Sequence, residues 1–213
     1  MSGPKPASQA KLATLVLRQS DLPTGWTGAA HQNDPSAAQF DAQLSSCVGI
    51  RNTDPDRYVE AYSQDFSHPD GLVPDAIGST ASSYLSQSDL SADEAKLASP
   101  KTAGCLKQLA MAEASSQLPA GATISSLDFT LTPHPSGYPS NVVAIGEAHA
   151  VVLYSGIKIY IDALQAFMVG PRIEASVNVT QAKQARPAAG ATLSAWSVAK
   201  AAIVAVATRT AAA

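Results

Sequence analysis

The N-terminal part of the chain begins with a short apolar run that stops abruptly. Residues 11–17 have the spacing of a short helix, and Leu22-Pro23 ends it, because the residue before a proline is disfavoured in the helical region. Pro23 and Gly25 then predict a turn that folds the Trp26 indole back onto the core. The alternative is an exposed Trp26 that binds a ligand.

The next hundred residues alternate between helical and strand-like patterns. Asp34 suits the N-cap and Pro35 the first position of a helix that Gly49 ends. A break at Ser99-Pro100 separates two further helical segments. The elements predicted here are helices over residues 34–47, 88–98 and 100–117 and strands over residues 58–66 and 77–85.

From residue 127 onwards the period of the apolar positions changes to two, which is typical of strands. The segment ARPAAGA, residues 185–191, has the composition of a linker before a terminal helix. A length of 213 residues favours one domain, over residues 11–210, after a leader or linker at residues 1–10. The predicted elements are strands over residues 127–131, 142–154, 157–169 and 173–180 and a helix over residues 193–206.

The three long strands can be aligned from their turns. If Ser155-Gly156 forms a two-residue hairpin turn, His149 faces Asp162 across the strand pair. For the next hairpin we expect a three-residue loop, residues 170–172, which puts the apolar residues of the last strand on the same face as Ile161, whereas a two-residue loop puts them opposite. One face is then aliphatic. The other carries Glu147, His149, Lys158, Tyr160, Asp162, Asn178 and Thr180.

This predicted polar face has two interpretations. It is either structural, solvated or covered by a helix with its polar groups mutually satisfied, or it lines a ligand cleft. A carboxylate beside His149 favours the protonated imidazole, which gives the position acid–base potential. A metal site on Glu147 and His149 needs another close ligand, and none has motif spacing, so no metal is assigned. The candidate ligand-binding residues are Glu147, His149, Lys158, Tyr160, Asp162 and Asn178.

Composition narrows the choice of partners. The chain has 46% hydrophobic and only 15% charged residues, with a formal net charge of -3 and no long run of either sign. Such a surface lacks the electrostatic footprint of a nucleic-acid or anionic-membrane binder. No segment approaches the ~18 consecutive apolar residues of a membrane span, and residues 1–10 lack the apolar core of a secretory signal. We therefore expect no nucleic-acid partner and no membrane span; a monomer is compatible with the sequence.

Motifs of common enzyme classes are missing from the sequence. It contains no G-x-S-x-G nucleophile elbow, no phosphate-binding loop, no dinucleotide fingerprint and no H-E-x-x-H pair. This absence weighs little, because many active sites combine distant residues. No catalytic residue and no cofactor is assigned.

Cys47 and Cys105 are the only two cysteines, and they match neither a C-x-x-C nor a zinc pattern. A disulfide between them would join two predicted helices and destabilise the unfolded chain by about 4 kcal/mol in the loop-entropy model. The alternative is two buried free thiols. A disulfide would indicate an oxidising compartment outside the cytoplasm.

Several short motifs together resemble one group of proteins. They are LxxxDLPxGW at residues 17–26, CVGI from residue 47, DFS at residues 65–67 and SPKTAGCL from residue 99. Their order and cysteine spacing are similar to those of extracytoplasmic domains from high-GC Gram-positive bacteria. The group includes actinobacterial lipoproteins, secreted proteins of unknown function and, more distantly, the extracellular sensor domains of mycobacterial PknH-type Ser/Thr kinases.

The resemblance spans most of the chain and implies a fold and a compartment. It implies a single α+β domain, an antiparallel sheet packed by helices, exported beyond the cytoplasmic membrane and similar in build to sensor or ligand-binding lipoprotein domains. It implies no particular ligand and no catalytic residues. The sequence departs from the group in having no signal peptide, lipobox cysteine or kinase domain.

Two functions of different class are consistent with these observations. We favour a non-enzymatic extracytoplasmic binding or sensor module for a small polar molecule or a cell-envelope component, with a cleft between the polar face and a helix or the loop at residues 133–140. The alternative is a hydrolase-type enzyme that uses His149 with Asp162 or Glu147 and a serine or water nucleophile. A serine hydroxyl within hydrogen-bond reach of His149 would favour the enzyme.

Overall fold

One antiparallel sheet forms the centre of the protein in the computed structural model, which describes residues 7–32, 35–49, 57–69, 73–97, 99–184 and 194–213. Within this part of the chain the sheet has eight strands in the order β1-β3-β4-β8-β7-β6-β5, with β2 also paired to β4. The strands are β1 (Thr27–Ala29), β2 (Arg57–Tyr62), β3 (Asp65–His68), β4 (Val73–Tyr84), β5 (Thr123–Pro133), β6 (Val142–Tyr154), β7 (Ile157–Gly170) and β8 (Ile173–Lys183).

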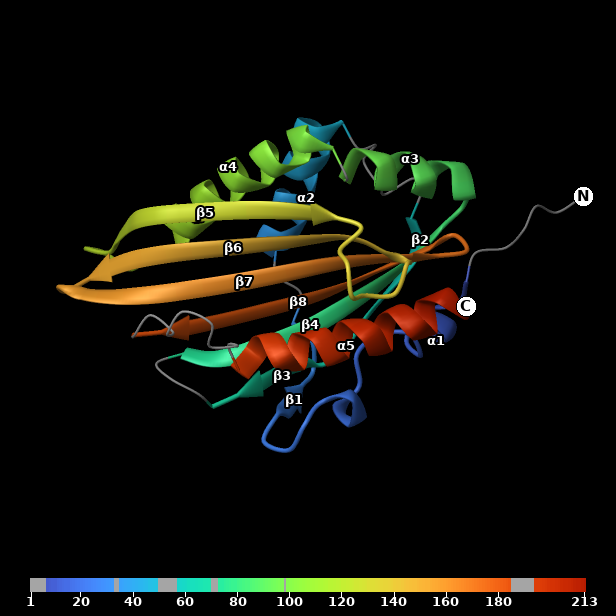
Figure 1. Cartoon of the computed structure of the whole chain (residues 1–213), viewed down its shortest axis with the longest axis horizontal. Coiled ribbons are helices and arrows are strands. Elements are labelled where there is room, and N and C mark those ends of the chain that lie inside the picture. Colours follow the sequence, from blue (N-terminus) through green and yellow to red (C-terminus); the bar gives the residue numbers. More distant parts are fainter. Residues whose placement is uncertain (1–6, 33–34, 50–56, 70–72, 98, 185–193) are drawn as a thin grey trace, which may run out of the picture.

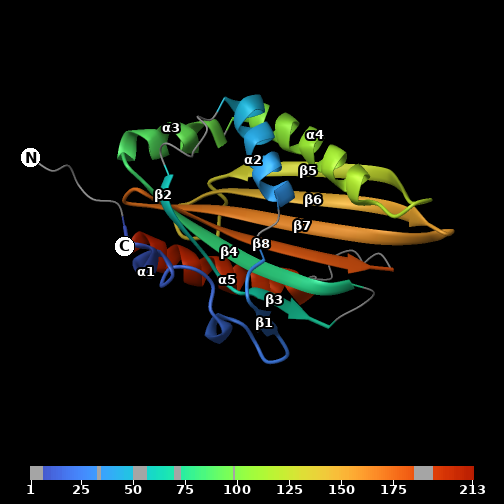
Figure 2. The same cartoon turned by 180° about the vertical axis from the view of Figure 1, so that it is seen from behind.

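Helices lie on both faces of the sheet, as Figures 1 and 2 show from opposite sides. One face, which we call the α5 side, carries α1 (Gln9–Leu12) and α5 (Ser194–Ala211). The opposite face, the α4 side, carries α2 (Pro35–Val48) and α4 (Pro100–Gln117), with α3 (Gln87–Leu97) at one end. The fold is therefore the expected α+β arrangement. None of the described helices is long and apolar enough to span a bilayer.

The larger hydrophobic core fills the space between the sheet and α5. Leu164 of β7 and Val177 of β8 pack there with Ile203 of α5, which is completely buried. A smaller cluster on the α4 side joins Leu97 of α3 to Phe167 of β7. The sheet thus buries apolar side chains on both faces, and the expectation of one aliphatic and one polar face is wrong.

The segment at residues 17–26 packs against the core, as the sequence predicts. Trp26 is only 7% exposed and packs in the main core, which confirms the buried indole and rules out the exposed alternative. The preceding helix is shorter than expected, because α1 ends at Leu12 and the buried residues 15–17 lie outside any helix. Consecutive buried residues do not suit one face of a helix. The Leu17 backbone N–H instead donates to Ser79 Oγ of β4, at 2.6 Å.

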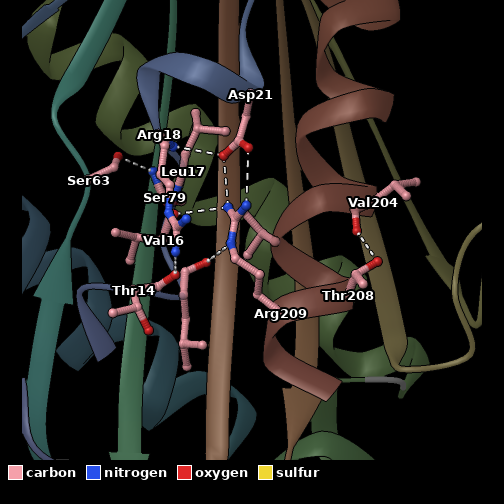
Figure 3. A network of polar contacts seen from close by, with 12 residues as sticks. Thr14, Val16, Leu17, Arg18, Asp21, Ser63, Ser79, Val204, Thr208 and Arg209 are labelled. Atoms are coloured by element: carbon pink, nitrogen blue, oxygen red, sulfur yellow. Dashed lines mark hydrogen bonds and ion pairs between the residues drawn. The ribbon is translucent and has the colours of Figure 1, made fainter. Parts of the chain in front are cut away.

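Arg209, near the end of α5, holds this segment in place (Figure 3). Its guanidinium donates to both oxygens of Asp21, at 3.1 and 2.8 Å, and to the backbone carbonyls of Leu15 and Val16. Burial acts to raise the pKa of Asp21. The hydrogen bonds from Arg209 and the Arg18 backbone and the charges of both arginines outweigh it, so the pKa lies below its ordinary value.

The first predicted hairpin is confirmed in detail. Ser155 and Gly156 both have positive φ angles, 50° and 79°, which a two-residue turn of the I′ type requires. His149 pairs with Asp162 and Val152 with Ile159. The register inferred from the turn alone is therefore correct from Tyr154 back to Ala144, and it shifts by one residue before Val142.

The second hairpin differs from the prediction. Gly170 pairs directly with Ile173, so the turn has two residues, Pro171 and Arg172, and not three. Proline suits the first central position of a type II turn, and Arg172 takes the left-handed conformation, with φ 57°, that the second position needs. The shift of one residue places every β8 side chain on the opposite face from the one expected.

Most other predicted elements are present with shifted ends. The predicted strand at residues 58–66 is two strands, β2 and β3, with a break at Ser63, whose backbone N–H and side chain both bond to Ser79. Cys47 of α2 and Cys105 of α4 form a disulfide, which excludes the free-thiol alternative. Residues 1–6, the Asp34 N-cap and the linker at residues 185–191 lie outside the described residues; Gln9 and Ala10 of the expected leader belong to α1.

Candidate functional site

His149 and Asp162 form a close pair on the α5 side of the sheet. His149 Nδ1 lies 2.6 Å from Asp162 Oδ1, a hydrogen bond that the pairing of β6 with β7 sets up. The His149 side chain is 47% exposed and that of Asp162 only 11%. The pair therefore links the solvent-facing surface to a largely buried carboxylate.

Gln181 of β8 completes this arrangement, and sequence reasoning missed it. Its amide Nε2 donates to Asp162 Oδ2 at 3.1 Å, so both oxygens of that carboxylate are occupied. Gln181 is 1% exposed, and its buried Oε1 has no hydrogen-bond partner among the described residues. A signal was available: in β8 the apolar positions recur at every second residue from Ile173 to Val179, and the next position in that series is Gln181.

Two further carboxylates lie beside His149. Asp128 of β5 is its direct neighbour in the register, and Glu147 lies two residues along β6 on the same face. In the described part of the chain, neither carboxylate forms a hydrogen bond or ion pair. We call this set the polar cluster: Asp128, Glu147, His149, Asp162 and Gln181.

The loop between β5 and β6 and helix α5 border the polar cluster. The loop reaches α5 (Figure 1), where Asn141 Nδ2 donates to the Ala207 carbonyl at 2.9 Å. Lys200 Nζ of α5 lies 5.4 Å from the centre of the Tyr138 ring in this loop. Burial and, second, the charge of Glu147 raise the pKa of Tyr138, which places the Glu147 carboxylate near the loop.

A second ion pair continues the polar surface across the sheet. Lys183 Nζ of β8 lies 3.1 Å from Asp75 Oδ1 of β4, and the Asp75 side chain is 1% exposed. Tyr160 is the register neighbour of Lys183 and is half-buried, while Lys158 is exposed near the Ser155-Gly156 turn. Such a deeply buried carboxylate needs its cation, so this pair is a structural feature of the sheet.

The candidate residues of the predicted polar face do not all lie together. Strand alternation places Glu147, His149, Lys158, Tyr160 and Asp162 on the α5 side. Asn178 and Thr180 lie on the α4 side, so their placement with the other residues is wrong. The cause is the two-residue second hairpin, which reverses the faces of β8.

The polar cluster offers acid–base and hydrogen-bonding groups. In the described residues, Asp162 is the hydrogen-bond partner of His149, and no serine hydroxyl reaches that imidazole. The same residues include no group of three or more histidine, cysteine or acidic side chains arranged to hold a metal ion. What the cluster can do is bind a polar group through several short-range contacts.

Among known proteins, a distant structural similarity is found. No protein-family model and no curated protein matches the chain. Among solved structures, the chain is similar to the extracellular domain of PknH from Mycobacterium tuberculosis, with a TM-score of 0.47 and 12% sequence identity over 97% of this chain and 100% of that chain. The similarity is distant and carries no ligand, activity or residue role to this chain.

Proposed function

We propose that this protein is an extracytoplasmic, sensor-type domain that binds a small polar ligand at the polar cluster without chemical turnover. The proposal has two parts, a compartment and a binding site. Each part has its own support and its own test.

The disulfide between Cys47 and Cys105 supports the compartment. Structural disulfides persist in oxidising environments and are rare in the cytosol, where thioredoxin and glutathione keep thiols reduced. The bond joins α2 to α4 across 58 residues and involves a Cys105 side chain that is 4% exposed. A crosslink between two helices, buried at Cys105 and half-buried at Cys47, suits a structural role in an exported domain.

The observation that carries the binding site is the unpaired acceptor of Gln181. A buried polar atom without a partner costs about 1–3 kcal/mol, so native proteins keep few of them. This one adjoins the His149–Asp162 pair, which extends to the surface. A bound polar group that donates a hydrogen bond would satisfy the Gln181 oxygen.

The site can be tested by nuclear magnetic resonance with three probes of similar length: 1,4-butanediol, 1,4-diaminobutane and succinate. We expect at least one probe to shift the backbone amide signals of His149, Asp162 and Gln181 in a saturable way. The His149→Ala variant should lose this binding and keep its melting temperature. Gln108→Ala, a change at an exposed position of α4 on the opposite side of the sheet, is the control and should bind like the wild type.

A structural network predicts the reverse result. None of the three probes would then shift the cluster signals, and His149→Ala would lower the melting temperature because Asp162 loses a hydrogen-bond partner while remaining largely buried. That outcome would reject the binding site and leave the fold unaffected.

A further inference from the structure

Apart from His149 Nε2, whose role depends on the tautomer, the polar atoms of the polar cluster without a partner in the described part of the chain are acceptors. His149 Nδ1 and Gln181 Nε2 are both used on Asp162. Gln181 Oε1 and the carboxylates of Glu147 and Asp128 have no hydrogen-bond or ion-pair partner in the described part of the chain. A ligand that satisfies these atoms must therefore donate hydrogen bonds.

The charges of the cluster also favour a cationic ligand. Three carboxylates, Asp128, Glu147 and Asp162, lie on the same face as His149, on three neighbouring strands. Glu147 is half-buried, where water screens its charge less than at a fully exposed position. These carboxylates would repel an anionic ligand.

The border of the cluster already holds an ammonium group of the chain itself. Lys200 lies over the Tyr138 ring, and Tyr138 is close enough to Glu147 for the carboxylate to affect its titration. An aromatic ring beside a carboxylate is a common combination in sites that recognise organic cations. Tyr160, half-buried on the same face, provides a second aromatic ring on the β7 side of the cluster.

We propose that the ligand of the polar cluster is a small organic cation, whose ammonium group bonds to Glu147 and Gln181 and whose body lies against Tyr138. This inference rests on the proposed binding function and adds the charge of the ligand. The independent support for a ligand at this acidic surface is the buried, unpaired Gln181 oxygen, since carboxylates alone would be a solvated face.

The three four-carbon probes separate the ligand classes, because they differ in charge at nearly constant length. We expect 1,4-diaminobutane to shift the signals of Glu147, His149 and Gln181 in a saturable way, and 1,4-butanediol and succinate to have no effect at equal concentration. Glu147→Gln removes one charge with little change of shape and should weaken diamine binding about tenfold, and added salt should weaken it further.

Glu94→Gln is the matched control. Glu94 lies on α3, outside the polar cluster, so its removal changes the net charge equally and should leave diamine binding unchanged. An equal loss in both variants would show nonspecific attraction and overturn the proposal. If Glu147→Gln does not fold, Asp128→Asn at an exposed position gives the same test with an expected loss of several-fold.

The remaining outcomes distinguish this inference from the proposed function. Binding of the diol or succinate to the cluster without binding of the diamine would keep the binding function and reject a cationic ligand. Failure of all three probes to shift the cluster signals would reject both.

Discussion

At the scale of single residues, two contacts give the N-terminal segment its fixed position. Trp26 fills part of the core, and Asp21 binds Arg209 from the opposite end of the chain, 188 residues away. The motif at residues 17–26 therefore has a structural explanation: Leu17 and Trp26 are buried, and Asp21 anchors the turn between them to α5.

Trp26→Ala should lower the free energy of unfolding by roughly 3–5 kcal/mol, the usual range for removing a buried large aromatic side chain. Chemical denaturation followed by circular dichroism measures the change. Trp196→Ala, at a half-buried position on α5, is the control and should cost less. Equal midpoints for Trp26→Ala and the wild type would mean that the indole contributes no packing.

The Asp21–Arg209 pair should make the free energy of unfolding depend on pH. The pKa of Asp21 is lowered in the folded state from its ordinary value of 3.8, so its stabilising contribution is present above that value and is lost as the pH falls through the folded pKa. We expect Asp21→Asn to cost about 1–3 kcal/mol at pH 7 and much less near pH 2.

Urea denaturation at the two pH values checks this dependence. Asp128→Asn, at an exposed position without an ion-pair partner in the described residues, is the matched control and should show a smaller difference between the two pH values. A loss for Asp21→Asn that is the same at both pH values would contradict an electrostatic role.

At the scale of elements, the two hairpins show how the residues of a turn determine the register of the strands that it joins. Ser155-Gly156 needs two left-handed residues, and its sequence allows them at modest strain. Pro171-Arg172 needs only one, which Arg172 supplies. The first turn aligns His149 with Asp162, and the second brings Gln181 beside them.

Ser155→Asn should stabilise the first hairpin by about 0.5–1 kcal/mol, because asparagine adopts the left-handed conformation more readily than serine. Ser155→Val should destabilise it, since a β-branched residue is strained at positive φ. Thermal denaturation of both variants measures the effect. Similar melting temperatures would show that this turn does not control the stability of the strand pair.

At the scale of the whole molecule, the disulfide connects the two helices that lie on the α4 side of the sheet. α2 packs on α4, and α4 packs on β5, so the crosslink ties α2 to the sheet through α4. Loss of the bond should therefore affect α2 more than the core between the sheet and α5.

The double variant Cys47→Ser/Cys105→Ser should lose about 2–4 kcal/mol of stability relative to the oxidised protein. Hydrogen exchange measured by mass spectrometry should show faster exchange in α2 than in α5, whose core is separate. Non-reducing mass spectrometry of protein isolated from its natural host should show Cys47 linked to Cys105. Two free thiols in that sample would contradict an extracytoplasmic location.

Local sequence determined the features that depend on neighbouring residues. The Ser155-Gly156 turn and the alternation beside it were sufficient for the His149–Asp162 pair, because a two-residue turn leaves one register. The proline at the start of α4 and the apolar period of α5 likewise located these helices to within a few residues. Two cysteines in predicted helices were enough to suggest the crosslink.

Tertiary structure decided the features that depend on which face a strand buries. Both sides of the sheet carry apolar side chains, so the pattern of β8 alone did not show whether Asn178 or Gln181 shares a face with Asp162. A turn longer by one residue at Pro171-Arg172 would exchange the two possibilities. The Asp21–Arg209 pair was also beyond sequence reasoning, because no local period relates residues 188 positions apart; only the packing of α5 brings them together.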